Sequence, residues 1–160
     1  MLHGEECLPM LERFERFSLS LFELSRCWHK LASEEMSRHG LRSSHATYLT
    51  TLLRCEEGIT AVELGRLCSR DKSDVSRMIG ILSEKGFVTK VEVDGSLYRG
   101  RWKLTETGRT AAEQVCHRAS LAVEMAGGDL TEAQRAVFYE ALASITANLK
   151  ALSKEGLPHE

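Results

Sequence analysis

The chain has 160 residues, of which 42% are hydrophobic and 28% are charged, so it fits one folded domain, alone or with an oligomerisation element, and not a disordered chain. The formal net charge of −2 excludes a histone-like polycation, and any affinity for nucleic acid must come from a local patch. No uncharged apolar run approaches the roughly 18 residues that span a bilayer, and charged residues interrupt any signal-peptide core near the N-terminus. We therefore expect a cytoplasmic protein with no membrane partner.

The first predicted element is a long helix in residues 10–31. Its large apolar residues recur at alternating spacings of 4 and 3, which is typical of a helix with one continuous apolar seam. The seam consists of Met10, Phe14, Phe17, Leu21, Leu24, Trp28 and Leu31. The two prolines, Pro9 and Pro158, lie outside residues 10–157, so no proline interrupts a helix between them.

Two short helices are predicted next. Residues 43–54 are expected to form a helix that begins at a Ser cap. Thr60 with Glu63 is a capping-box signature, and it predicts a second helix that ends near Ser69.

A charged turn at residues 70–72 leads to a third, amphipathic helix from about Ser73 to Lys85, which Gly86 stops. Two helices of roughly ten residues joined by such a turn form a helix-turn-helix arrangement. The outer face of the third helix carries Ser73, Asp74, Ser76, Arg77 and Gly80. The major groove admits a helix whose outward side chains are short, or long and basic. Asp74 fits only if it accepts a hydrogen bond from a cytosine amine or caps the helix.

After Gly86 the hydrophobic period changes to 2, which predicts a β-hairpin with a turn at residues 94–96. On the return strand, Tyr98, Gly100, Trp102 and Leu104 share one side, and Arg99, Arg101 and Lys103 share the other. Three cations on one face are what a wing laid along phosphates presents. The alternative is a solvated strand edge kept soluble by Lys and Arg. Residues 54–104 carry a net charge of +2 and the remainder −4, which favours DNA as the partner.

Two further helices are predicted at the C-terminal end. Residues 106–126 repeat small side chains, and Gly127 and Gly128 end that helix. The last helix begins at Thr131, which stands in capping-box register with Gln134. Its seam consists of Phe138, Leu142, Ile145, Leu149 and Leu152, and Gly156 is its stop. These thin seams are buried either in an intramolecular bundle or in a dimer with interleaved chain ends, and we expect the dimer.

Three local motifs carry a resemblance to a known family. Thr60-Ala-Val-Glu-Leu-Gly-Arg-Leu67 is similar to a T-x-x-E-L-A-x-x-L helix. Asp71-Lys-Ser-Asp-Val-Ser-Arg77, followed by Leu82-Ser-Glu-Lys-Gly-Phe-Val88, is similar to a recognition helix with its L-x-x-x-G-L-V exit, and Leu104-Thr105-Glu106-Thr107-Gly108 matches L-T-x-x-G. With the order of elements, these segments resemble the MarR family of bacterial transcription regulators over nearly the whole chain.

The resemblance implies a mainly α, winged helix-turn-helix fold with long N- and C-terminal dimerisation helices. It places the N-terminal dimerisation helix in residues 1–42, the DNA-binding domain in 43–105 and the C-terminal dimerisation helices in 106–160. It further implies a homodimer that binds a pseudo-palindromic operator in double-stranded DNA, usually as a repressor. By position, Ser73, Ser76 and Arg77 would face the major groove, and a wing arginine would enter the minor groove.

The wing departs from the family pattern, because the D-x-R of the family falls on Ser96 and Tyr98. Arg99 or Arg101 is the candidate replacement. The full set of predicted DNA-binding residues is Arg70, Lys72, Ser73, Asp74, Ser76, Arg77, Arg99, Arg101 and Lys103. The alternative function is a winged-helix protein-interaction module that does not bind DNA, in which the wing cations meet an acidic partner.

The sequence lacks a local Cys-His signature, a G-x-S-x-G motif and a Gly-rich phosphate loop. We therefore expect that the protein is not an enzyme and binds no cofactor. Glu113 and His117 are spaced i, i+4, but no second His stands at ligand spacing, and no metal site is expected.

Two kinds of sensing site are candidates in this chain: a reactive cysteine and a small-molecule pocket. Some members of the resembled family switch on oxidation of a first-helix cysteine, which makes Cys7 and Cys27 the redox candidates. Cys55, Cys68 and Cys116 are expected to be small buried hydrophobes. The resemblance also implies a small-molecule effector pocket between the dimer helices and the winged domain. Its candidates are Phe17, Trp28 and Tyr48, each of which is also a candidate core residue.

Overall fold

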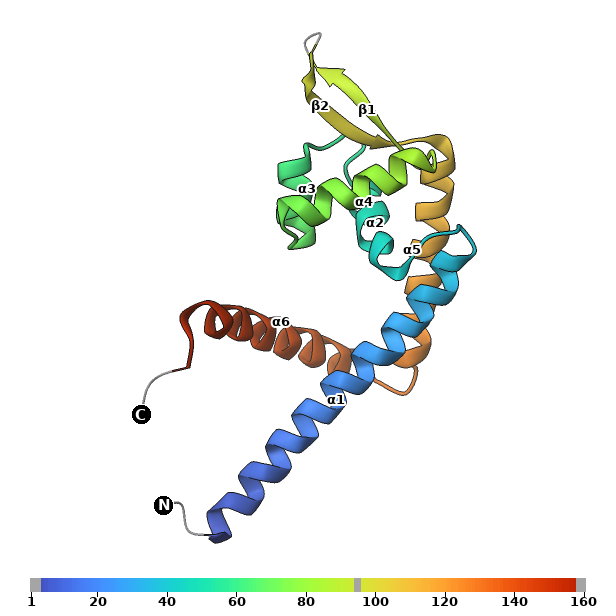
Figure 1. Ribbon diagram of the computed structural model, residues 1–160. Helices are drawn as coiled ribbons and strands as arrows, with labels where there is room; N and C mark the ends of the chain where they lie inside the picture. Colours follow the sequence, from blue (N-terminus) through green and yellow to red (C-terminus); the bar gives the residue numbers. More distant parts are fainter. Residues whose placement is uncertain (1–3, 94–95, 158–160) are drawn as a thin grey trace. The chain divides into compact units, whose positions relative to one another are not determined.

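The computed structural model describes residues 4–93 and 96–157. Its elements follow the order that Figure 1 shows: α1 (Gly4–Ser37), the 3-10 turn η1 (Ser43–His45), α2 (Ala46–Leu53), α3 (Ala61–Cys68), α4 (Lys72–Glu84), β1 (Val88–Val93), β2 (Ser96–Leu104), α5 (Glu106–Ala126) and α6 (Glu132–Glu155). The chain divides into two compact units, one ending at Ala119 and the other beginning at Ser120. The mainly helical, winged-helix prediction is confirmed, and α1 is longer at both ends than its seam indicated.

Reciprocal side-chain bonds fix the starts of two helices. The Glu63 backbone N–H donates to the Thr60 hydroxyl (3.3 Å), and the Glu63 carboxylate accepts from the Thr60 N–H (3.0 Å). Thr131 and Gln134 repeat this capping box at α6. Both boxes satisfy backbone donors that a helix N-terminus leaves free, and both were predicted.

The predicted Ser cap before α2 is wrong. The 3-10 turn η1 precedes α2, and the N-cap of η1 is Arg42, whose backbone is extended. The His45 Nδ1 lies 3.1 Å from both the backbone N and the carbonyl O of Arg42, so the imidazole provides the local bond that a serine was expected to make. The Ser44 hydroxyl donates instead to the Met78 sulfur on α4 (3.8 Å).

One hydrophobic core lies within the first unit. The helices α2, α3 and α4 contact one another in sequence, and the hairpin contacts α2 and α4. The end of α1 and the start of α5 add residues from outside the predicted 43–105 segment. The core residues are Met36, Leu41, Tyr48, Leu49, Leu52, Ile59, Leu64, Cys68, Val75, Met78, Ile79, Leu82, Phe87, Val88, Ala111, Ala112 and Val115.

The hairpin pairs antiparallel, with Val88 opposite Leu104 and Lys90 opposite Trp102. Val88 is buried, whereas Thr89 and Val91 are exposed. Two strand limits differ from the prediction. Phe87 precedes β1 because its N–H still donates to the Leu82 carbonyl at the end of α4 (2.8 Å), and Ser96 belongs to β2. The predicted turn residues Asp94 and Gly95 lie outside the described residues.

The L-T-x-x-G motif closes the junction between the wing and α5. The Thr105 hydroxyl donates to the Gly86 carbonyl (2.6 Å) and accepts from the Gly108 N–H (3.0 Å). A Cβ on Gly108 would stand 1.8 Å from the Phe87 carbonyl oxygen. Only glycine therefore permits this approach of α5 to the exit of α4.

The apolar seams of α1 and α6 remain exposed in the single chain. Phe14 and Leu24 on α1 are 65% and 64% exposed, and α6 has no buried residue along its 24 residues. In proteins, most of the stability of an amphipathic helix comes from packing of its apolar face. No helix in the part of the chain described here is long and apolar enough to cross a membrane.

Candidate nucleic-acid interface

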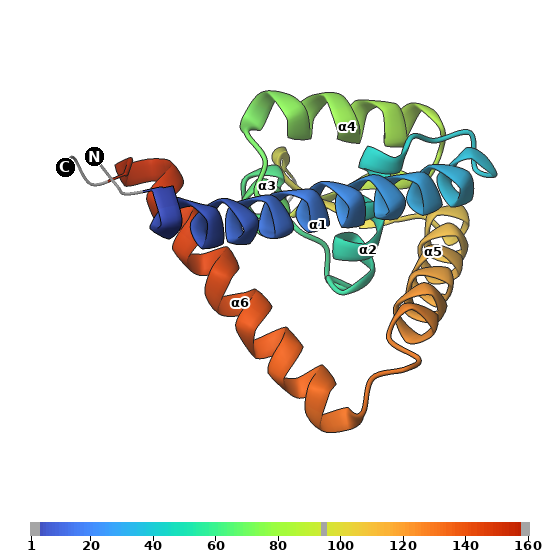
Figure 2. The same ribbon diagram turned by 90° about the horizontal axis from the view of Figure 1, so that it is seen from below.

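The helix α4 has one face in the core and one face free. Val75, Met78, Ile79 and Leu82 are buried, which fixes the orientation of the helix about its axis. Figure 2 shows α4 at the margin of the α2–α4 cluster. The free face presents the exposed residues Lys72, Ser73, Ser76 and Arg77. These are the short and basic side chains that suit the major groove.

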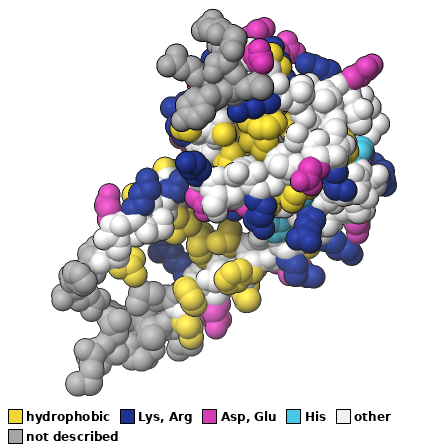
Figure 3. Space-filling model, turned by 45° about the horizontal axis from the view of Figure 1, so that its top comes forward, with side chains coloured by type: hydrophobic (Ala, Val, Ile, Leu, Met, Phe, Trp, Pro, Cys, Tyr) yellow, Lys and Arg dark blue, Asp and Glu magenta, His cyan; other side chains and the backbone are white. Residues whose placement is uncertain are grey.

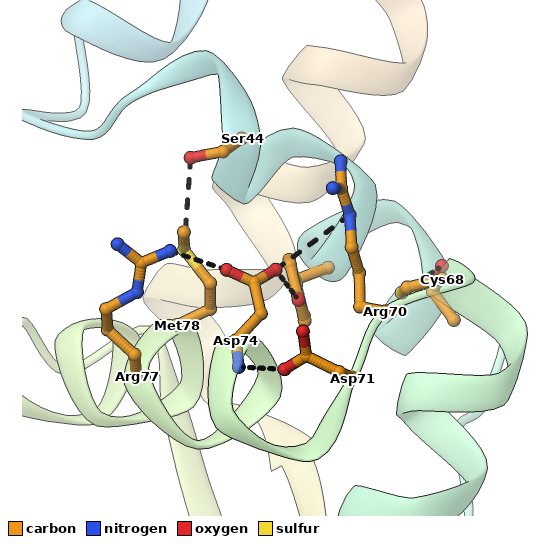
Figure 4. Close-up of polar contacts among 9 residues, drawn as sticks. Ser44, Cys68, Arg70, Asp71, Asp74, Arg77 and Met78 are labelled. Atoms are coloured by element: carbon orange, nitrogen blue, oxygen red, sulfur yellow. Dashed lines mark hydrogen bonds and ion pairs between the residues drawn. The ribbon is translucent and has the colours of Figure 1, made fainter.

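Asp71 caps this helix. Its carboxylate accepts from the Asp74 backbone N–H (2.8 Å), as Figure 4 shows, so α4 starts at Lys72. This bond corrects one sequence-based interpretation, in which Asp71 belonged to a charged turn and Asp74 was a candidate cap. An Asp at the N-cap is a recognisable signal before an apolar-periodic run.

Asp74 lies between two arginines (Figure 4). The Arg77 Nη2 donates to its Oδ1 (2.6 Å), and the Arg70 Nε lies 3.8 Å from its Oδ2. A third group reaches the same carboxylate from α2, since the Tyr48 hydroxyl donates to Oδ2 (2.8 Å). The Asp74 side chain is 19% exposed, whereas those of Arg70 and Arg77 are more than half exposed.

The pKa shifts agree with this arrangement. The bond from Arg77, and then the bond from Tyr48, hold the pKa of Asp74 below its ordinary value. Burial, and then the Asp74 carboxylate, raise the pKa of Tyr48 well above its ordinary value. Near neutral pH, Asp74 is therefore an anion, and Tyr48 keeps the proton that it donates.

The wing cations lie against the segment that precedes α3. The Arg101 Nη1 donates to the Gly58 carbonyl (3.3 Å), and the Lys103 Nζ lies 3.9 Å from a Glu57 carboxylate oxygen. On the other face of the hairpin, the Lys90 ammonium lies 5.8 Å from the centre of the Trp102 ring. Arg101 and Lys103 thus share a face, as strand alternation requires, but that face is partly covered. The side chain of Arg99 lies outside the described residues.

The charge on the surface is mixed. On the face that Figure 3 shows, Lys and Arg side chains are interspersed with Asp and Glu. This distribution matches the small net charge of −2. A phosphate-binding surface must therefore be local, such as the free face of α4 with the wing.

Comparison with known proteins identifies the fold through structure alone. No protein-family model and no curated protein sequence matches the chain. A solved MarR family transcription regulator superposes with a TM-score of 0.79 at 15% identity, covering 93% of this chain and 98% of that one. The chain has the MarR fold.

Two further solved structures extend this likeness. A MarR transcriptional regulator from Methanosarcina mazei Go1 gives a TM-score of 0.71 at 22% identity, with coverage of 86% of this chain and 92% of that one. A protein assigned to the MarR family in Listeria monocytogenes, solved in complex with a 26mer DNA, gives 0.71 at 20% identity, with coverage of 88% and 95%. In all three, the MarR fold extends over most of both chains.

Within this MarR fold, the predicted DNA-binding residues fall into two groups. Arg70, Lys72, Ser73, Asp74, Ser76 and Arg77 lie together on or beside α4, and Arg101 and Lys103 lie on β2. Reasoning from the sequence missed the bond between Tyr48 and Asp74. No local pattern announces it, because 26 positions separate the two residues.

The predicted sensing residues are dispersed. Tyr48 is in the core, whereas Phe17 and Trp28 are exposed on α1. The exposed Cys27 thiol donates to the Glu23 carboxylate (3.6 Å), and the side chain of Cys7 lies outside the described residues. Cys68 is buried, and Cys55 and Cys116 are half-buried. Residues 4–93 and 96–157 contain no group of three or more His, Cys, Asp or Glu that could hold a metal ion.

Proposed function

We propose that the protein is a homodimeric transcriptional regulator that binds a specific sequence in double-stranded DNA. The observation that carries the proposal is the free face of α4, with Lys72, Ser73, Ser76 and Arg77 exposed on a helix whose other face is locked in the core. The likeness to MarR regulators, one of them solved with DNA, supports it.

In this proposal, Ser73, Ser76 and Arg77 read base edges in the major groove. Arg70 and Lys72, at the start of α4, contact phosphates, because basic side chains and helix N-termini are common phosphate-binding groups. The wing contributes Arg99, Arg101 and Lys103 to the phosphates or the minor groove. We further propose that the protein represses transcription and acts in the cytoplasm. The resemblance to the MarR family, whose members are usually repressors, supports repression.

The homodimer follows from the exposed seams. Leu24 on α1 and Phe138 on α6 belong to apolar rows that stay in contact with water in one chain. Burying apolar surface contributes about 25 cal/mol per Å2, so two such helices gain stability from a second copy. A dimer also presents two α4 helices, which matches a pseudo-palindromic operator.

The test is binding of the purified protein to the DNA immediately upstream of its own gene, because self-regulation is usual in the resembled family. An unrelated fragment of equal length is the control, and both are measured at two salt concentrations. We expect specific binding that weakens steeply with salt, since phosphate contacts release counterions. A flat plot of log K against log salt contradicts DNA binding. Binding to neither fragment favours the protein-interaction module.

A further inference from the structure

The free face of α4 contains an acidic residue where an anion is unfavourable. Asp74 stands between Ser73 and Arg77, in the first turn of the helix proposed to face DNA. A carboxylate beside phosphates weakens binding through like-charge repulsion. Its position therefore calls for a physical reason, and its contacts supply one.

Both oxygens of Asp74 are held. Oδ1 accepts from Arg77 (2.6 Å), and Oδ2 accepts from the Tyr48 hydroxyl (2.8 Å) and lies 3.8 Å from Arg70. Tyr48 is 1% exposed and belongs to the core, so its hydroxyl is a fixed point. A short Asp side chain bonded to a fixed donor becomes a fixed acceptor for the two arginines beside it.

The two arginines are far more exposed than Asp74. The side chains of Arg70 and Arg77 are 56% and 64% exposed. A long exposed side chain loses conformational entropy when DNA immobilises it, and prior restraint lowers that loss. Arg77 donates a hydrogen bond to Asp74 through Nη2, so its other guanidinium N–H groups can still bond a base edge.

We propose that Tyr48 and Asp74 are positioning residues that hold Arg77 and Arg70 in the orientation that binds DNA. The bond between Tyr48 and Asp74 thereby raises the ratio of the affinity for the operator to the affinity for unrelated DNA. The inference rests on the proposed function. Loss of the Asp74 charge makes the surface more positive and strengthens binding to any duplex. Loss of its position removes the orientation of Arg77 and weakens only specific binding.

The test uses the duplex that the wild-type protein enriches from a random-sequence pool, and an unrelated duplex of equal length. Tyr48→Phe removes one hydroxyl and no charge. We expect the ratio of the two affinities to fall by about five- to tenfold, at the lower end of the discrimination that one good base contact provides. Affinity for the unrelated duplex and the salt slope stay unchanged, because no cation is lost. Tyr139→Phe, which removes the hydroxyl of a 51% exposed tyrosine on α6, is the matched control and keeps the wild-type ratio.

Two substitutions of Asp74 separate charge from position. Asp74→Asn removes the charge, and we expect tighter binding to unrelated DNA with a lower ratio. Asp74→Glu keeps the charge but displaces the carboxylate, so the ratio falls while binding to unrelated DNA stays at the wild-type level. Melting temperatures identify any variant that fails to fold, and the ratio is compared well below them.

The outcomes distinguish the two ideas. A wild-type protein that enriches no sequence overturns the proposed function, and this inference falls with it. A wild-type protein that discriminates, with Tyr48→Phe and Asp74→Glu folded and at the wild-type ratio, overturns the positioning role alone.

Discussion

Arg77 is the long basic side chain at the centre of the free face of α4. We expect Arg77→Ala to weaken operator binding by about 1 to 3 kcal/mol, because one good base contact contributes that much. A gel shift with the selected duplex measures the change. Arg135→Ala, which removes a half-buried arginine at the start of α6, is the control. Operator affinity unchanged within error removes Arg77 from the interface.

His45 is a buried histidine with one unsatisfied nitrogen. It is 2% exposed, and its Nε2 has no hydrogen-bond partner among the described residues. Burial lowers the pKa of His45, and the nearby cations Arg42, Lys85 and Arg77 lower it further, whereas its backbone bond to Arg42 acts in the opposite direction. Adding a proton to His45 therefore opposes folding.

The sign of the pH effect follows from this shift. The unfolded chain binds the proton near the ordinary histidine pKa of about 6.5, and the folded chain binds it at lower pH. The stability associated with neutral His45 is complete above that value and is lost as the pH falls through the folded pKa. We expect His45→Asn to flatten the pH dependence of the free energy of unfolding in this range, measured by urea denaturation. His117→Asn, at an exposed position on α5, should keep the wild-type slope; an equal slope in all three proteins contradicts the assignment.

At the scale of elements, replacing two helical glycines with alanine should have opposite effects on the free energy of unfolding. A Cβ on Gly108 meets the Phe87 carbonyl at 1.8 Å, whereas a Cβ on Gly80 in α4 meets nothing within 4 Å. Gly108→Ala forces α5 away from the exit of α4, and we expect a loss of about 1 to 3 kcal/mol or more. Gly80→Ala should be neutral or stabilising by up to about 1 kcal/mol, because alanine favours the helix. Urea unfolding of both variants measures the difference, and equal effects refute the close approach.

At the scale of the whole molecule, the proposed dimer depends on the apolar seam of α1. Leu24 is 64% exposed in one chain, and we expect Leu24→Glu to dissociate the dimer because it buries a charge in an apolar interface. Sedimentation velocity reports the change in mass, and operator binding should fall with it. Ser33→Glu adds the same charge at an exposed position on the opposite face of α1 and should stay dimeric. A Leu24→Glu variant of unchanged mass excludes this seam from the interface.

Local chemistry in the sequence determined the elements and their faces. Thr60 with Glu63 and Thr131 with Gln134 announced two helix starts, because a capping box involves residues only three positions apart. The glycines at 86 and 156 marked the ends of α4 and α6 in the same way. The apolar period of α4 also determined which of its side chains meet the core, and hence which are exposed on its free face.

Tertiary structure decided the contacts of the candidate interface. The bond from Tyr48 to Asp74 spans 26 positions, and the bond from Arg101 to Gly58 spans 43. Their sequence neighbours contain no trace of either, because a side chain finds a distant partner only after the core has brought α2, α4 and the wing together. The same reason applies to Gly108, whose need for glycine arises from the Phe87 carbonyl on another element. Periodicity and caps act within a few residues, whereas the orientation of the arginines depends on how the elements pack.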